Sequence, residues 1–397
     1  MKPLFLFHVI MLLFLNSSYA QFSDFTLFDS KTLTSKKIAY KISNPEVVKQ
    51  VQVVIKNAEK LLNANPESVM DKSLTPTSKS KHDYMSIGPY WWPDPSKPDG
   101  LPYIRKDGER NPTINNITDH QFLNNLNNRC KFLALAYFFT ENEKYAAKAQ
   151  EFLSVWFINP STKMNPNFNY AQAIPGINDG RGIGIIESRV LVDIADWICL
   201  LDGAKSFPIS EKNKIKEWYK QYLDWMLTSK NGIDEQHSQN NHGTYYDMQI
   251  IRYSLFTDDQ KLAIKTLTEA KKRIALQIEE NGKQPLELER TNAYSYSTMN
   301  LEGWFNMAIM SDKVGVNLWD YTNAKGGSLN KALNWLIPYA FEEKTREYKQ
   351  INSYNISAMQ RLLLIATKEY KSNFTEKLAL IPKSDESLLT DLLFKVF

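Results

Sequence analysis

The stretch DHQFLNNLNNRCKFLALAYFFT, residues 119–140, decides the fold class. Its apolar residues recur at spacings of three and four, as at Leu123, Leu126 and Cys130, which places them on one face of an α-helix. The same periodicity appears in further stretches near residues 45–64, 142–157, 183–203, 209–229, 244–281, 297–312 and 328–343. Alternating, β-branched runs bounded by turn residues are almost absent, so we predict an all-α protein without a substantial sheet.

Short connections separate many of the predicted helices. This spacing favours helical hairpins that stack around a shared core. The length of 397 residues allows one large domain or two ordinary ones, and no linker clearly divides the chain. We therefore expect a single domain over residues 21–397.

Residues 1–20, MKPLFLFHVIMLLFLNSSYA, have the layout of a secretory signal. One early lysine, Lys2, precedes an apolar core and a small-residue ending. The apolar run is shorter than the roughly 20 residues that a membrane-spanning helix needs. We expect export to a periplasm or to the outside of the cell, a mature chain that begins near Gln21, and no membrane attachment after cleavage.

Charge and cysteine content narrow the class of protein further. The formal net charge is +4 and charges of both signs are interspersed, which is not the basic footprint of a nucleic-acid-binding protein. Cys130 and Cys199 lie in apolar helical contexts, so we predict two buried free thiols rather than a disulfide. The sequence leaves the oligomeric state open.

Two long connections, residues 82–118 and 158–182, interrupt the helical pattern. Connections of this length within a compact domain are usually functional or disordered. The first is too apolar for a solvated tail, because it contains the aromatic residues Tyr84, Tyr90, Trp91, Trp92 and Tyr103. We predict an ordered loop whose aromatic side chains line a cleft.

A polar group precedes the helical pattern that follows residue 243. Asn240, Asn241 and His242 stand in a row before Gly243, in a chain with five histidines. A helix start presents unpaired N–H groups and a positive dipole end, which suits an anion such as a uronate carboxylate. A capping asparagine beside a surface histidine is the alternative, but three consecutive polar side chains favour a functional site.

A second polar group lies in residues 285–304, where Glu287, Glu289, Arg290, Tyr294 and Tyr296 crowd a short segment before a helix. Arginine offers a fork of donors that matches a carboxylate. Tyrosine can exchange a proton if nearby positive charge lowers its pKa. These residues are suited to β-elimination, and a salt-bridged helix entrance with buried tyrosines explains them equally well.

Common metal and cofactor patterns are missing from the sequence. It has no His-x-x-x-His or Glu-x-x-His spacing, no Gly-x-Ser-x-Gly and no phosphate-binding glycine-rich loop. We expect acid–base chemistry by side chains, without a metal or another cofactor.

Four segments in order resemble the alginate lyase superfamily, which includes polysaccharide lyase families 5 and 38. They read YWWPDPSKPDGLPYIRKDGERNP, NPNFNYAQAIPGINDGRGIGIIESR, NNHGTYYDMQ and LERTNAYSYSTMNL, and the similarity runs from about Tyr84 to Leu301. The resemblance implies an α/α toroid of six or seven helical hairpins. It also implies a cleft that binds an anionic, β-linked uronan.

The resemblance also implies roles for single residues. Asn241, His242 and Arg290 would surround the uronate carboxylate, and Tyr296 would handle protons, with Tyr294 as the fallback. We expect further substrate contacts from Asn240, Tyr294, Tyr246, Trp91, Trp92, Tyr90, Arg181 and Glu287. Other carboxylates along the polymer would bind to the cations Lys81, Arg105, Arg110, Arg181 and Arg189. We expect Glu187 and Asp247 to orient the Asn and Arg groups.

The implied reaction is β-elimination of alginate, with mannuronate-rich blocks ahead of guluronate and glucuronan as the closest alternative. Tyr296 would act alone where the C5 hydrogen and O4 share one face of the sugar, and His242 would be the base where they do not. Two other functions remain open at this point. One is a glycoside hydrolase with paired carboxylates, and the other is a non-catalytic glycan-binding protein.

Overall fold

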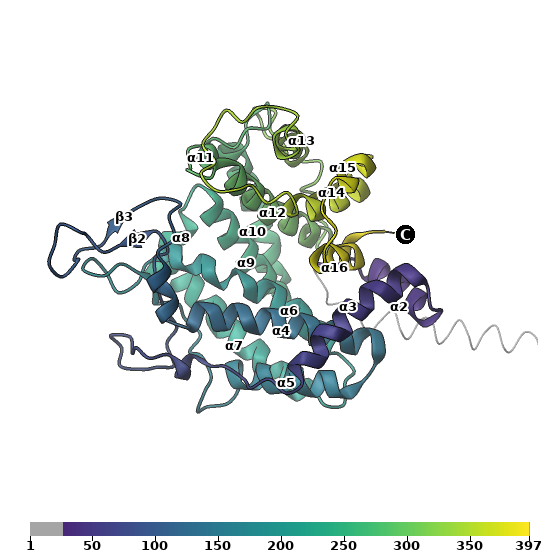
Figure 1. Cartoon of the computed structure of the whole chain (residues 1–397), viewed down its shortest axis with the longest axis horizontal. Coiled ribbons are helices and arrows are strands. Elements are labelled where there is room, and N and C mark those ends of the chain that lie inside the picture. The colour runs from purple at the N-terminus through teal and green to yellow at the C-terminus, as the bar shows by residue number, and fades with distance from the viewer. Residues whose placement is uncertain (1–26, 397) are drawn as a thin grey trace, which may run out of the picture.

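A computed structural model describes residues 27–396 (Figure 1). The predicted signal, residues 1–20, lies outside the described residues. Within residues 27–396, no helix combines the length and apolar character that crossing a membrane requires.

Helices dominate the structure, which confirms the predicted all-α class. The helices that coincide with predicted stretches are α3 Pro45–Leu61, α4 Asp119–Thr140, α5 Glu143–Phe157, α6 Val190–Leu200, α7 Ile209–Thr228, α9 Asn241–Phe256, α10 Gln260–Gln277, α12 Ala293–Asp312 and α13 Leu329–Ala340. The single helix predicted over residues 244–281 is wrong, because α9 and α10 are separate. Between them Asp258 has φ 67°, and the Asp259 side chain accepts from the backbone N–H of Leu262 to cap α10.

The sequence pattern did not predict several other helical segments. These are α2 Ser30–Lys41, α8 Lys230–Gln236, α11 Pro285–Leu288, α14 Ala358–Glu369, α15 Thr375–Ala379, α16 Asp385–Phe394, and the 3-10 segments η1 Val69–Asp71 and η2 Pro112–Asn116. A third 3-10 segment, η3 Gly182–Arg189, lies at the start of the predicted helical stretch 183–203. Helix α2 is mostly polar and α8, α11 and α15 are short, so their apolar periodicity is weak.

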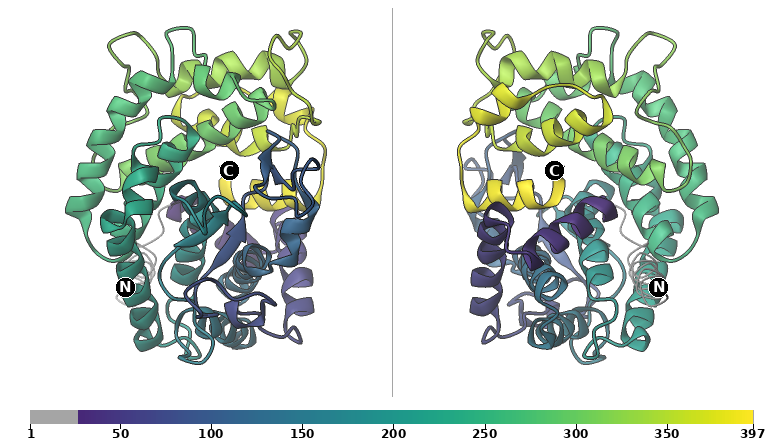
Figure 2. Two further views of the ribbon diagram at one scale, coloured as in Figure 1. Left: turned by 90° about the vertical axis from the view of Figure 1, so that its left-hand side faces the viewer. Right: turned by 90° about the vertical axis from the view of Figure 1, so that its right-hand side faces the viewer.

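The helices form the successive hairpins of an α/α toroid (Figure 2). Helices α4, α6, α9, α12 and α14 contact one another in that order, and α5, α7, α10 and α13 pack against them. The C-terminal helix α16 contacts α14 on one side and α2 and α3 on the other, so the first and last of the described helices meet. One cluster of buried apolar side chains extends from Leu27 to Leu393.

Two small strand pairs order the long connections. Strand β1 Met85–Ile87 pairs in parallel with β4 Tyr170–Ala173, so the two connections lie side by side. Strand β2 Trp91–Trp92 pairs antiparallel with β3 Ile104–Arg105 and forms a projection at one end of the molecule (Figure 1). The prediction of an ordered first connection is therefore confirmed.

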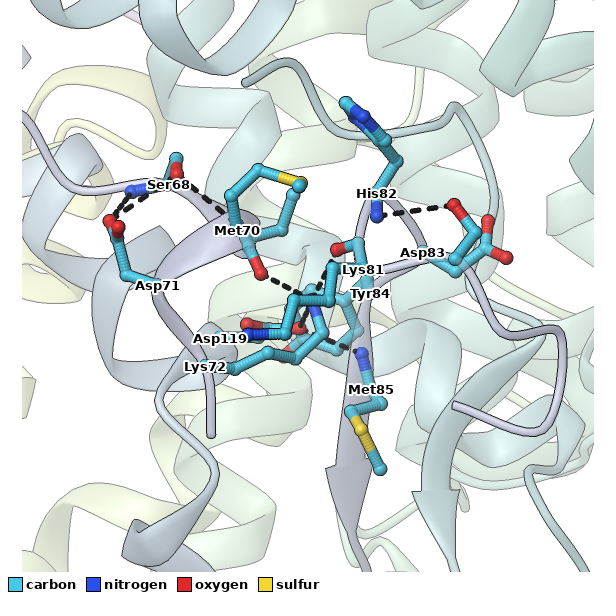
Figure 3. Close-up of polar contacts among 12 residues, drawn as sticks. Ser68, Met70, Asp71, Lys72, Lys81, His82, Asp83, Tyr84, Met85 and Asp119 are labelled. Carbon is cyan, nitrogen blue, oxygen red and sulfur yellow. Dashed lines mark hydrogen bonds and ion pairs between the residues drawn. The ribbon is translucent and has the colours of Figure 1, made fainter. Parts of the chain in front are cut away.

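A buried ion pair fixes the first connection at both ends (Figure 3). Lys72 Nζ lies 2.9 Å from Asp119 Oδ2, and both side chains are fully buried. The same carboxylate oxygen accepts from the backbone N–H of Met85 at 2.9 Å. Burial raises the pKa of Asp119 to about 6 despite Lys72. Because Met85 begins the connection and Asp119 begins α4, this carboxylate joins the two ends of the loop.

The two cysteines, Cys130 on α4 and Cys199 on α6, are free and buried, as predicted. Burial raises the pKa of the Cys130 thiol to about 12 and that of Cys199 to about 11. Both thiols therefore remain protonated at neutral pH.

Candidate active site

A cleft of about 990 Å³ brings together both long connections and the starts of α4, α9 and α12. Most of the residues singled out in the sequence line it: Tyr90, Trp91, Arg181, Asn240, Asn241, His242, Arg290 and Tyr296. The two polar groups near residues 240 and 290, separate in the sequence, thus share one cavity.

His242 lies in the first turn of α9, where Asn240 is the N-cap residue and accepts from the backbone N–H of His242 at 3.2 Å. His242 Nδ1 lies 2.8 Å from Oε1 of Glu235, a buried residue near the end of α8. An ionised Glu235 requires the proton on Nδ1, which leaves the Nε2 lone pair available. In this arrangement the Nε2 atom of His242 can accept a proton. Sequence reasoning missed Glu235, whose signal was only its position seven residues before His242.

The turn before α9 is held by Arg273. Its guanidinium donates to the backbone carbonyls of Gln236 and Ser238 and pairs with Asp247 at 2.8 Å. A side chain at position 243 would overlap both Arg273 and the Ser238 carbonyl, which explains Gly243. The expectation that Asp247 orients the Asn and Arg groups is therefore wrong, because Asp247 instead supports this turn through Arg273.

Asn241 is fully buried and is fixed by Glu287. Its backbone N–H and its side-chain Nδ2 donate to the two oxygens of the Glu287 carboxylate at 2.6 and 2.7 Å. Within residues 27–396, its Oδ1 atom has no hydrogen-bond partner. Burial raises the pKa of Glu287, although both bonds from Asn241 oppose the rise. Glu287 is 1% exposed and does not line the cleft, so it positions Asn241 rather than contacting substrate as expected.

Tyr296 and Arg290 form the second half of the site. Arg290 Nη2 donates to the Tyr296 hydroxyl at 2.9 Å, and its guanidinium lies 3.8 Å from the centre of the Tyr296 ring. The Tyr90 hydroxyl lies 2.8 Å from the same oxygen. Burial and Tyr90 raise the pKa of Tyr296 above its usual range and outweigh Arg290. A lowered tyrosine pKa, considered from the sequence, is thus wrong for this state: Tyr296 is a neutral phenol.

Asp107, in the first connection, holds Arg290. It accepts from Arg290 Nη2 at 2.8 Å and Nε at 3.3 Å, and from Thr291 Oγ1 at 3.1 Å. Arg105 Nη2 lies 2.8 Å from the same carboxylate. Burial would raise the pKa of Asp107, but the hydrogen bonds and charge of Arg290 hold it at about 2. The sequence offered no signal for this contact, because Asp107 and Gly108 look like an ordinary turn.

Besides Glu287, three further predicted substrate contacts lie outside the cleft lining. Tyr294 is fully buried and its hydroxyl accepts from the backbone N–H groups of Glu347 and Tyr348. It stands two residues before Tyr296, which in a helix turns it by roughly 200° to the far side. Tyr246 donates to the carbonyl of Met226. Trp92 donates to the carbonyl of Glu109, because consecutive strand residues point to opposite faces and Trp91 takes the cleft side.

The lining of the cleft carries more positive than negative charge. Five arginines line it against two carboxylates; the residues are Arg105, Arg110, Arg181, Arg189, Arg290, Glu187 and Glu289. Four of the five cations expected to meet further carboxylates thus lie here. The fifth, Lys81, is absent from the lining, and its carbonyl accepts from Lys72.

Glu187 lines the cleft but does not orient the Asn or Arg groups as expected. Its carboxylate accepts from the hydroxyls of Tyr84 and Ser86 at 2.8 and 2.6 Å. It therefore connects η3 to the start of the first connection. Across the part of the chain that the structure describes, no group of three or more His, Cys, Asp or Glu side chains is placed to hold a metal ion.

Known alginate lyases resemble this chain in sequence and in fold. The alginate lyase family profile matches residues 68–346. The chain is similar to an alginate lyase from Bacteroides ovatus, with 38% identity over 94% of this chain and 99% of that one, and a TM-score of 0.89. Alginate lyase A1-III from Sphingomonas species A1 shares the fold, at 13% identity over 86% and 94% of the two chains with a TM-score of 0.56. No protein of curated function matches. Both the profile and the Bacteroides structure cover most of the sequence, and the chain belongs to the alginate lyase family.

Proposed function

We propose that this chain cleaves a β-1,4-linked uronan by β-elimination, with mannuronate-rich alginate as its preferred substrate. As a member of the alginate lyase family, it is a polysaccharide lyase. One observation carries the proposal: a carboxylate-oriented imidazole, His242, and a phenol bonded to arginine, Tyr296, share one positive cleft. Variants of the Sphingomonas lyase with His replaced by Ala or Tyr by Phe are complexed with a tetrasaccharide, which supports a polymeric sugar as the partner.

The reaction removes the C5 proton beside the C6 carboxylate and expels the O4 leaving group. Negative charge builds on the carboxylate as the proton departs, so donors aimed at that group stabilise the transition state. In this proposal Arg290 and the Nδ2 group of Asn241 supply that stabilisation. Glu287 and Asp107 keep both donors in place before substrate arrives.

Tyr296 is the proton donor to O4 in this mechanism, since its raised pKa keeps the phenol protonated. His242 then takes the C5 proton at Nε2. This division of roles suits guluronate, where the C5 hydrogen and O4 lie on opposite faces of the sugar. In mannuronate the C5 hydrogen and O4 lie on the same face. Tyr296 must then be ionised when it takes the C5 proton, and Arg290 is the group that stabilises the phenolate. The raised pKa therefore favours guluronate cleavage as a second candidate activity.

A panel of polymannuronate, polyguluronate and glucuronan tests the proposal. The expected result is a rise in ultraviolet absorbance from unsaturated uronate ends, fastest with polymannuronate. New reducing ends without that absorbance would identify a hydrolase instead. Binding without new chain ends would identify a glycan-binding protein. Faster cleavage of glucuronan than of either alginate block would reassign the substrate.

We also propose that residues 1–20 direct export of the protein. The charged start, apolar core and small-residue ending support this proposal. Cell fractionation with N-terminal sequencing tests it, and a mature chain that begins near Gln21 in the periplasm or medium is expected. An intact Met1 in the cytoplasmic fraction would contradict it.

A further inference from the structure

The arginines of the cleft differ in how their charge is balanced. Arg290 and Arg105 share the Asp107 carboxylate, each at 2.8 Å. Arg181 contrasts with both, since within residues 27–396 no carboxylate lies within ion-pair distance of its guanidinium. Its hydrogen bonds go to neutral acceptors instead. The carboxylates of Glu187 and Glu235 act on Arg181 only by attraction over a longer distance, so its guanidinium has no direct counter-ion among residues 27–396.

Gln172 holds the Arg181 side chain in place. Arg181 Nε donates to the Gln172 carbonyl at 2.9 Å, and Nη2 donates to Gln172 Oε1 at 3.1 Å. Gln172 has φ 49°, a left-handed conformation that is costly for residues other than glycine. This conformation is stabilised by the Gln172 backbone N–H, which donates to Ser86 Oγ at 2.8 Å.

The surroundings of Arg181 leave its position little freedom. The guanidinium lies 5.7 Å from the centre of the Trp91 ring. A side chain at position 88 would overlap Arg181 Nη2, so Gly88 provides the space that the guanidinium occupies. An ordered side chain loses less entropy when it binds a ligand, so this fixing favours recognition of an anion.

Arg181 belongs to the same wall of the cleft as His242. The next residue, Gly182, packs so closely on α8 that a side chain there would overlap the Asn231 carbonyl and approach the backbone nitrogen of Glu235. Glu235 is the residue that holds His242. Burial and the charge of Arg105 lower the pKa of Arg181 to about 10, so it remains a cation at neutral pH. The negative charge of an incoming anion would offset both effects.

We propose that Arg181, fixed by Gln172, binds the carboxylate of a sugar adjacent to the reacting one, and so selects polymers that are acidic beyond the cleavage site. The identity of that carboxylate as a uronate rests on the proposed function. Arg290 remains the partner of the reacting sugar. We therefore expect Arg181 to contribute to substrate binding, and Arg290 and Tyr296 to contribute to the chemical step.

Binding measurements in a Tyr296→Phe background separate recognition from turnover. Isothermal titration with a uronan tetrasaccharide and with its methyl ester compares a charged ligand with a neutral one. Arg181→Gln should weaken binding of the acid about tenfold or more, the loss expected for a charge-assisted hydrogen-bonded pair, and change binding of the ester less than about twofold. Gln172→Asn, which shortens the side chain and tolerates the left-handed backbone, should weaken acid binding by an intermediate factor.

The matched control is Lys265→Gln on the exposed side of α10, which removes one positive charge at a distance from the cleft. It should leave both dissociation constants unchanged. Equal weakening of acid and ester by Arg181→Gln, or no weakening of either, would overturn the proposal. A general electrostatic effect, with Lys265→Gln as harmful as Arg181→Gln, would do so as well.

Steady-state kinetics with otherwise unaltered protein provide the second readout. Arg181→Gln should raise KM about tenfold with kcat nearly unchanged, because the bound carboxylate is not on the reacting sugar. A fall in kcat at constant KM would show that Arg181 acts on the reacting sugar, and would overturn the assignment. Failure of the proposed function is distinguishable, since the unaltered protein would then produce no unsaturated ends while the difference in binding between acid and ester could still be measured.

Discussion

Glu235 and His242 form a carboxylate–imidazole pair, with Oε1 2.8 Å from Nδ1. The pair fixes the tautomer that leaves Nε2 free to accept a proton. With polyguluronate, for which His242 is the proposed base, replacing Glu235 by Ala should lower kcat about 10- to 1000-fold with little change in KM, as expected when a general base loses its orienting partner. Glu235→Gln keeps a hydrogen-bond acceptor but no charge, so its kcat should fall less than that of Glu235→Ala. Unchanged kcat in Glu235→Ala would show that the tautomer of His242 does not matter to the reaction.

Tyr296 and Tyr294 provide a matched pair of substitutions on one helix. Tyr296→Phe should lower kcat about 100- to 10000-fold, because the proton donor is lost, while tetrasaccharide binding is retained. Tyr294→Phe removes a buried hydroxyl that accepts from two backbone N–H groups, in bonds that are partly buried. It should cost about 1–3 kcal/mol of unfolding free energy with kcat preserved. Substantial residual activity in Tyr296→Phe would refute its assignment, and so would a larger loss of kcat in Tyr294→Phe.

Asp107 should influence the pH range in which Tyr296 stays protonated. Its negative charge contributes to the raised pKa of Tyr296, and Arg290 opposes it. In Asp107→Asn the positive charge of Arg290 is no longer balanced, so the pKa of Tyr296 should fall. The alkaline limb of the kcat profile should then move to lower pH than in the unaltered protein. An ultraviolet titration of tyrosinate, with Tyr296→Phe as the blank, checks the direction, and a shift to higher pH would contradict it.

The buried Lys72–Asp119 pair should matter for stability more than for chemistry. Asp119→Ala leaves the Lys72 ammonium without its counter-ion in a fully buried position. The expected cost is about 3–5 kcal/mol of unfolding free energy, measured by denaturant titration. The double substitution Lys72→Met with Asp119→Leu should recover much of this loss, because no unpaired charge remains. A double variant as unstable as Asp119→Ala would show that the bond from Met85 to Asp119 is the larger contribution.

Periodicity was sufficient to predict most of the helices from the sequence, whereas their toroidal arrangement was implied by the family resemblance. It failed where local chemistry overrides a continuous apolar pattern, as at the break between α9 and α10, where Asp258 adopts a left-handed conformation. It also missed α2, because a mainly polar helix that packs where the first and last of the described helices meet has little apolar periodicity.

The candidate site was predictable only in part. The run from Asn240 to His242 marked a helix start, and Arg290 with Tyr296 came from the family resemblance. The choice between Tyr294 and Tyr296 depends on the helical phase of α12, which the sequence does not state. The contact between Asp107 and Arg290 could not be predicted from local sequence patterns, because the two residues lie 183 positions apart along the chain.

The attachment of Asp107 to Arg105, Arg290 and Thr291 has a consequence for how the protein loses activity. The segment that carries Asp107 rests on the helical scaffold through polar contacts, which open at lower free-energy cost than a packed core. Gentle heating or low denaturant should therefore release this segment and misplace Arg290 while the helices are still intact. Enzymatic inactivation would then precede the loss of the helical circular dichroism signal, and protease cleavage between residues 82 and 118 would accompany it.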